Sequence, residues 1–118
     1  MDMMSTLIWG LHAATSLEVY PAPAPEVANP PYLTVQMISD PMQDHNHSAG
    51  ASLHMSRVQI GHVGDYSVAR PYVLTVQNYL EGNKTDFASA LSDGIILDRQ
   101  EAEGLWVLIR GYYVQWKA

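Results

Sequence analysis

Five prolines between Tyr20 and Pro31 constrain the fold of this 118-residue chain more than any other feature. They are Pro21, Pro23, Pro25, Pro30 and Pro31. Each fixes its own φ and lacks a backbone N–H, so the stretch cannot be a paired central strand. We expect an ordered, extended segment that crosses between two elements or lies as an arm.

The segments on either side of the prolines have regular hydrophobic patterns. Apolar residues recur at helical spacing over residues 5–16, which predicts a short helix. Alternation over residues 33–37 predicts a half-buried strand, and a second, longer strand follows over residues 53–63. A change of phase within the second strand predicts a β-bulge near Ser56-Arg57. The polar segment of about residues 40–52 predicts a mobile hairpin loop between the two strands.

A helix is expected next, beginning at Asp65 or Ser67, either of which can cap it, and ending at Gly82. The apolar residues of this segment fall on one helical face. Pro71 lies in the first turns, where it removes a backbone hydrogen bond or kinks the helix.

The end of the chain predicts a β-hairpin formed by residues 95–99 and 105–116. The last strand is apolar on both faces as far as Ile109, with Trp106 and Leu108 on one face and Val107 on the other. A strand of this kind is either central in its sheet and covered on both sides, or covered by a neighbouring subunit.

Composition limits the function classes. Charged residues make up only 15% of the chain, against about 25% in typical domains; this favours self-association, although a polar uncharged surface would give the same figure. The net charge of −6 comes from 12 acidic and 6 scattered basic residues, which argues against a domain that grips nucleic acid. Without cysteine there are no disulfides, and no run approaches the roughly 20 apolar residues that span a bilayer.

The histidine-rich segment is where a metal site would be sought. Asp44, His45 and His47, with His54 further along, are ligand types that suit zinc. The alternative is a solvated loop that becomes ordered when it contacts a partner. The polar residues around the histidines, together with Gly50, favour this alternative. We predict a partner-contacting loop around Asp44, His45 and His47 and no bound metal.

The search for catalytic residues leaves no candidate. Glu101 and Glu103 form the most obvious acid pair, but a predicted hairpin turn would leave both solvated, with little reason for a shifted pKa. The chain contains neither a G-x-S-x-G turn nor a glycine-rich phosphate-binding motif. We predict no enzymatic activity, no catalytic residue and no cofactor.

The order of several short motifs, from about Leu7 to Trp116, is more specific than any one of them. These are a short N-terminal helix, Tyr20-Pro21, a proline-rich crossing into Pro31-Tyr32, Arg57-Val58-Gln59-Ile60, Asp65 opening a helix that ends in Leu80-Glu81-Gly82, and a closing aromatic hairpin. This order resembles the tail-completion proteins of long-tailed bacteriophages, the tail terminator or tail-to-head joining family. The resemblance implies a single α+β domain over residues 1–118, in which one longer and one short α-helix pack on a mainly antiparallel β-sheet.

The resemblance also implies a structural role in the virion. Such proteins form a hexameric ring at the head-proximal end of the tail, where the ring stops growth of the tail tube and presents a surface to the head connector. The implied partners are copies of the chain itself, the tail tube protein and a head connector or completion protein, and DNA passes through the lumen without specific binding. The alternatives are a head-completion protein of similar fold and a small metal-dependent hydrolase that uses the histidine-rich loop.

A ring formed by head-to-tail contacts needs two different surfaces on each subunit. We predict that one is the last strand, through Trp106, Leu108 and Tyr112. The other is the proline arm, through Pro21, Pro23 and Pro25.

Overall fold

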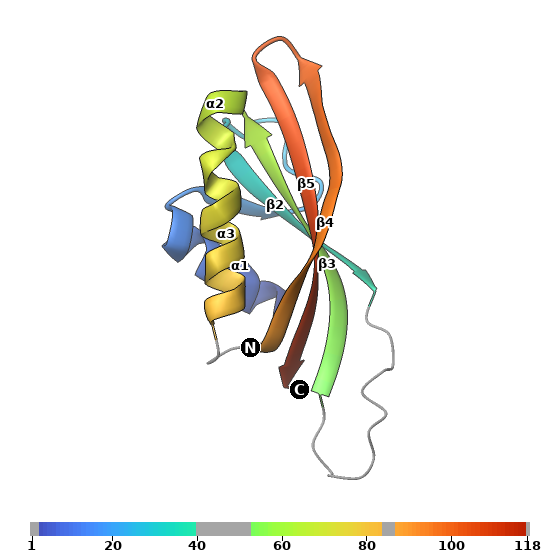
Figure 1. Cartoon of the computed structure of the whole chain (residues 1–118). Coiled ribbons are helices and arrows are strands. Elements are labelled where there is room, and N and C mark those ends of the chain that lie inside the picture. The colour runs from blue at the N-terminus through green and yellow to red at the C-terminus, as the bar shows by residue number, and fades with distance from the viewer. Residues whose placement is uncertain (1–2, 40–52, 84–86, 118) are drawn as a thin grey trace.

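A five-stranded sheet with all its helices on one face forms the architecture (Figure 1). The structure is a computed structural model and describes residues 3–39, 53–83 and 87–117. The elements in chain order are α1 (Met3–Thr15), β1 (Glu18–Pro21), β2 (Tyr32–Ser39), β3 (Leu53–Gly64), α2 (Tyr66–Ala69), α3 (Pro71–Gly82), β4 (Phe87–Ala102) and β5 (Leu105–Lys117). No described helix is long and apolar enough to cross a membrane.

The strands lie in the order β1-β2-β3-β5-β4, and only β1 and β2 run parallel. This confirms the predicted α+β class with a mainly antiparallel sheet. The hairpin of β4 and β5 is also confirmed, and β5 occupies an interior position between β3 and β4.

The sequence pattern did not predict β1, because the prolines that follow it indicated an unpaired extended segment. Glu18–Pro21 forms a short strand at the sheet edge, parallel to β2. Edge strands tolerate proline because one side of the backbone needs no partner, and Pro21 is the last residue of β1. The Ala22 N–H still donates to the Val35 carbonyl at 2.9 Å. The proline stretch therefore begins inside the sheet rather than beside it.

The alternation predicted for β2 is confirmed, since Leu33 and Val35 are buried while Gln36 is exposed. The β-bulge predicted near Ser56-Arg57 is wrong. β3 pairs with β5 without a register shift, and the irregularity lies on β2, between Met37 and Ser39. Ser56 occupies an inward position that an apolar residue would normally fill, because its hydroxyl accepts a hydrogen bond from Nε1 of Trp116 at 3.1 Å.

The predicted helix over residues 65–82 is divided at Arg70. Asp65 caps α2, its carboxylate accepting from the Ser67 N–H at 3.0 Å. Pro71 then begins α3, a position where its fixed φ suits the helix and its missing N–H costs nothing. The proline therefore starts a new helix instead of distorting an existing one.

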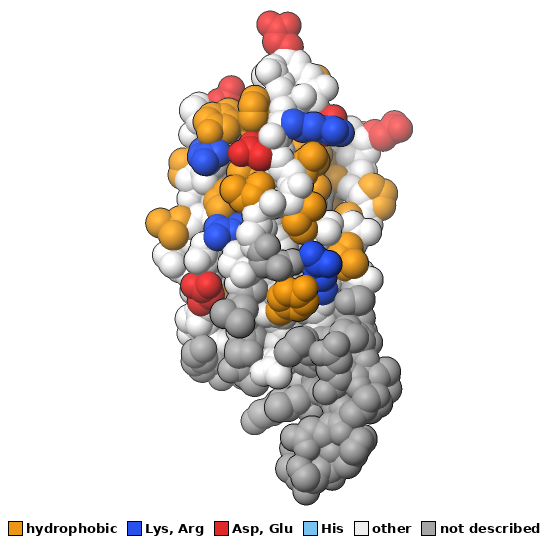
Figure 2. All heavy atoms as spheres, turned by 45° about the vertical axis from the view of Figure 1, so that its right-hand side comes forward, with side chains coloured by type: hydrophobic (Ala, Val, Ile, Leu, Met, Phe, Trp, Pro, Cys, Tyr) orange, Lys and Arg blue, Asp and Glu red, His pale blue; other side chains and the backbone are white. Residues whose placement is uncertain are grey.

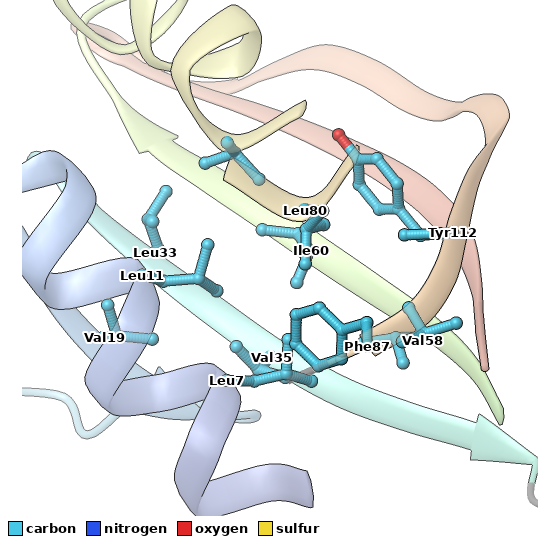
Figure 3. Packing of buried hydrophobic residues seen from close by; sticks show 13 residues of the cluster. Leu7, Leu11, Val19, Leu33, Val35, Val58, Ile60, Leu80, Phe87 and Tyr112 are labelled. Carbon is cyan, nitrogen blue, oxygen red and sulfur yellow. The ribbon is translucent and has the colours of Figure 1, made fainter. Parts of the chain in front are cut away.

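The core lies between the helices and the sheet (Figure 3). Leu7 and Leu11 of α1 and Leu80 of α3 are at most 1% exposed and pack against the inward side chains of the strands. Burying each such leucine is worth roughly 1.5–3 kcal/mol. Helix α1 approaches α3 closely at Gly10, where a Cβ atom would overlap the ring of Tyr79.

The β4–β5 ribbon is long and uneven. Its turn contains Gly104 at a φ of 74°, in the left-handed region that glycine tolerates. β4, at the sheet edge, pairs with β5 through four register shifts, and Gly94 within it has a φ of 91°. The repeated irregularities interrupt the hydrogen-bond ladder along this edge.

Candidate interaction surfaces

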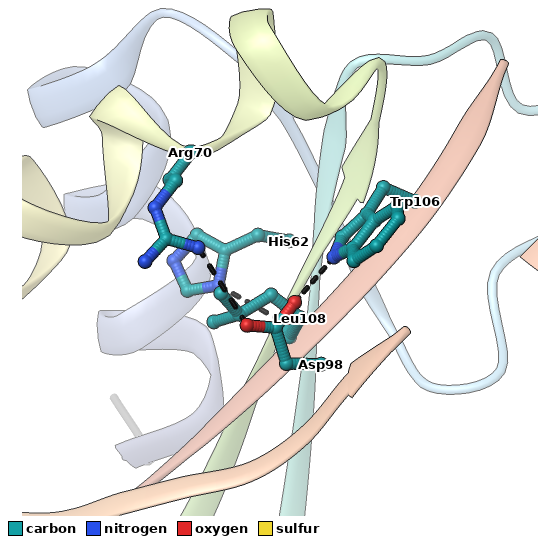
Figure 4. Close-up of polar contacts among 5 residues, drawn as sticks. All are labelled: His62, Arg70, Asp98, Trp106 and Leu108. Carbon is teal, nitrogen blue, oxygen red and sulfur yellow. Dashed lines mark hydrogen bonds and ion pairs between the residues drawn. The ribbon is translucent and has the colours of Figure 1, made fainter. Parts of the chain in front are cut away.

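A cluster of four polar and aromatic side chains, Tyr66, Arg70, Asp98 and Trp106, joins the helices to the end of the β4–β5 hairpin; Figure 4 draws the last three. The Tyr66 ring meets the Trp106 indole edge to face, with centroids 4.8 Å apart, and the Arg70 guanidinium lies 5.0 Å from the Tyr66 centroid. Trp106 donates through Nε1 to the Asp98 carboxylate, which also lies 3.6 Å from an Arg70 nitrogen. Beside this cluster is a hollow of about 410 Å³ lined by residues of α2 and the hairpin turn.

His62 lies in β3, beneath this cluster, and is only 1% exposed. Its Nδ1–H donates to the Leu108 carbonyl at 3.1 Å, and its buried Nε2 has no hydrogen-bond partner among the described residues. Burial lowers the pKa of His62 to about 4; the Leu108 hydrogen bond opposes this shift and the nearby Arg110 charge adds to it. The imidazole is therefore neutral at pH 7.

The three residues of β5 predicted to meet a neighbouring subunit all face the helices. Leu108 and Tyr112 are 4% and 0% exposed and belong to the chain's own core. Burial also raises the pKa of Tyr112 to about 12. Trp106 is only partly buried, at the end of β5 nearest the hairpin turn, so of the three its side chain is the most accessible to a partner.

The proline arm is an exposed surface at the opposite edge of the sheet. Pro21, Pro23 and Pro25 are all exposed. Next to them, Tyr20 of β1 packs edge to face on Tyr32 of β2, with ring centroids 5.6 Å apart. The arm therefore projects from a fixed edge strand.

The predicted partner-contacting loop with Asp44, His45 and His47 lies outside the described residues. His54 is in β3, opposite Trp116 in β5. Within residues 3–39, 53–83 and 87–117, no group of three potential metal ligands is close enough to hold an ion. Glu101, one of the acid pair noted in the sequence, accepts a hydrogen bond from Arg99 at 2.6 Å on the exposed surface.

The sheet face that points away from the helices is a surface that the site prediction missed. Val107 and Ile109 of β5 alternate with the inward residues and are only partly buried. Tyr113 on the same face is 38% exposed, and Arg57 lies over its ring at 5.5 Å. Figure 2, which turns the right-hand side of Figure 1 forward, shows several separate hydrophobic patches on the described surface, with arginine side chains among them. The apolar alternation of β5 was the signal for this face.

Comparison with solved structures is informative about the fold. No protein-family model matches the chain, and no curated protein does. Among solved structures, the chain is similar to one in the virion of a native gene transfer agent particle, with a TM-score of 0.60 and 15% sequence identity. The match covers 92% of this chain and 84% of that one. At this identity, the likeness shows that the two chains share a fold.

Proposed function

We propose that this chain is a structural protein of a phage-like virion, located at the head-proximal end of the tail. In this proposal it forms a ring that caps the tail tube and joins it to the head connector. The supporting observation is the fold shared with a virion chain over 92% of the sequence. The proposed role is structural and needs no catalytic residue.

The positions of the two predicted contact regions favour a ring. A head-to-tail interface joins two different surfaces, which must lie on different sides of the subunit if the ring is to close. The proline arm adjoins β1 at one edge of the sheet, while Trp106 lies in the β4–β5 ribbon at the other. We therefore propose that Pro21, Pro23 and Pro25 of one copy meet the Trp106 end of the next.

Leu108 and Tyr112 take a different role in this proposal. Because both are buried beneath the helices, they support the contact surface from within. The apolar outer face around Ile109 and Tyr113 then offers further contact area for the tail tube protein or the head connector. The loop around Asp44, His45 and His47 is proposed to contact the same partners.

The negative net charge of the chain is compatible with a ring whose lumen lets DNA pass. A ring of subunits with a net charge of −6 each repels the phosphate backbone, provided that part of the acidic surface lines the lumen. DNA would then pass through without specific binding.

Assembly of the purified protein on tail tubes tests the proposal. Native mass spectrometry measures the number of subunits, and negative-stain microscopy with the tail tube protein of the same particle shows where the ring binds. We expect a closed ring, about six subunits in size, at one end of the tube. Binding to the head connector alone would indicate the head-completion alternative, and failure to bind either component would contradict the proposal.

A substitution at Trp106 tests the proposed contact. Trp106→Ala should prevent ring closure while the monomer stays folded, as judged by circular dichroism. Asn78→Ala, an exposed position of α3, is the matched control and should assemble normally. A ring that forms equally well with both variants would exclude Trp106 from the interface.

A further inference from the structure

A groove runs between α3 and the β4–β5 ribbon. It measures about 240 Å³, and its lining includes Arg70, Val73, Leu74, Gln77, Ile95 and Arg110. Two large aliphatic side chains stand at its margins, Leu74 at 62% and Ile95 at 55% exposed. We call this feature the α3 groove. It lies on the helical side of the sheet, away from the outer face.

Arg110 places a cation in the α3 groove that has no ion-pair partner among the described side chains. Its side chain is only partly exposed, its Nε donates to the Ser92 hydroxyl at 3.0 Å, and its guanidinium carbon lies 6.0 Å from the Tyr112 centroid. Among the described residues, no carboxylate forms an ion pair with Arg110. A partly buried guanidinium has several donors in a planar fork, so it favours a carboxylate at this position.

The other arginines near the ribbon differ from Arg110 in this respect. Arg70 pairs with Asp98 at 3.6 Å, and Arg99 pairs with Glu101 at 2.6 Å. Glu81, one helical turn beyond Gln77, accepts from the Gln77 side-chain amide at 3.3 Å. The groove therefore has an excess of positive charge on a chain whose net charge is −6.

We infer that the α3 groove binds a short peptide segment of a partner protein, one that presents an acidic side chain flanked by aliphatic ones. The carboxylate pairs with Arg110, and the aliphatic side chains cover Leu74 and Ile95. A nucleic acid is a poor fit, because one unpaired arginine between apolar margins cannot follow a phosphate backbone.

Peptide binding in the α3 groove does not require the ring to form. Neither Leu74 nor Ile95 belongs to the proposed lateral contact, and a monomer presents the same groove. A failed ring assay and a failed peptide assay are therefore distinguishable.

A displayed library of random dodecapeptides, selected on the immobilised protein, is the probe. We expect the enriched peptides to share an aspartate or glutamate between aliphatic residues. For the best peptide, fluorescence anisotropy should show Arg110→Gln weakening binding by at least about tenfold, the loss typical of a charge-assisted hydrogen bond. Replacing the acidic residue of the peptide with its amide should weaken binding by about the same factor. Combining this peptide with the Arg110→Gln variant should weaken binding little further.

Arg99→Gln is the matched control, because it removes the same charge from an exposed arginine outside the groove. It should change the affinity less than about twofold at moderate ionic strength. Leu74→Ser, at an exposed position, provides a second test should Arg110→Gln unfold the protein, and should also weaken binding. Enriched peptides that lack an acidic residue, or that bind Arg110→Gln and Leu74→Ser as well as the wild type, would overturn the inference.

Discussion

The Trp106 indole nitrogen donates a hydrogen bond to the Asp98 carboxylate, which lies diagonally across the β4–β5 hairpin. The same carboxylate pairs with Arg70, at the junction of α2 and α3. Asp98 thus binds one residue from the sheet and one from the helical layer. The cluster fixes the orientation of Trp106, the residue proposed to contact a neighbouring subunit.

Removal of the Asp98 carboxylate should destabilise the protein measurably. Asp98→Ala is expected to lower the free energy of unfolding by about 1–2 kcal/mol, mainly through loss of the hydrogen bond from Trp106, since solvent screens the Arg70 pair. Urea denaturation measures the change. Glu101→Ala, which breaks an exposed ion pair, is the control and should cost under about 0.5 kcal/mol. Equal effects would mean that Asp98 does not link the two layers.

Gly10→Ala tests the close approach of α1 and α3. In an open helix this change stabilises by about 1 kcal/mol, but here the new methyl group would overlap the Tyr79 ring. We expect a net loss of about 1–3 kcal/mol, as is usual for overpacking. In a Tyr79→Ala background, the same substitution should become neutral or stabilising. Thermal denaturation of the wild type, the two single variants and the double variant measures this coupling, and additive effects would contradict the contact.

His62 should make the protein less stable in acid. Its pKa is about 4 in the folded chain against about 6.5 unfolded, so the unfolded chain binds more protons between these values. Stability is therefore unaffected above about pH 7 and falls as the pH drops from 6.5 to 4, by about 3 kcal/mol from this residue alone.

Urea denaturation between pH 7 and pH 4 measures this loss. His62→Gln, whose amide can still donate to the Leu108 carbonyl, should show a shallower pH dependence. Parallel curves for the two proteins would exclude His62 as the source.

The Tyr112 hydroxyl should contribute little to stability. It is buried and has no hydrogen-bond partner among the described residues, while the ring itself is 0% exposed. Tyr112→Phe should therefore be neutral or slightly stabilising, whereas Tyr112→Ala should cost about 3–5 kcal/mol because it leaves a cavity. Chemical denaturation separates the two effects. A large loss with phenylalanine would reveal a bond from the hydroxyl.

Local patterns in the sequence predicted the elements that depend on local chemistry. The Asp65 cap, the alternation of Leu33 and Val35, and the hairpin ending at Trp116 could all be recognised from neighbouring residues. β4 extends back to Phe87, well before the predicted start at Ile95, because this stretch has weak strand propensity and is paired only through contact with β5.

Features that depend on tertiary pairing could not be predicted. The irregularity lies in β2, and Ser56 of β3 keeps an inward position where its hydroxyl accepts from the indole of Trp116, 60 residues further along the chain. The alternation in β5 defined two apolar faces but not which of them the helices cover. Leu108 and Tyr112 were therefore predicted at an interface, although the fold places them in the core.

The two edges of the sheet restrict how copies of this protein can associate. β1 offers only four residues and ends in proline, and β4 is interrupted by four register shifts. Neither edge can act as a regular template for an incoming strand, so open-ended growth by strand addition, as in amyloid, is disfavoured. Contacts between copies must then be made by side chains, and the angle between neighbouring copies decides whether such contacts close into a ring or continue as a filament.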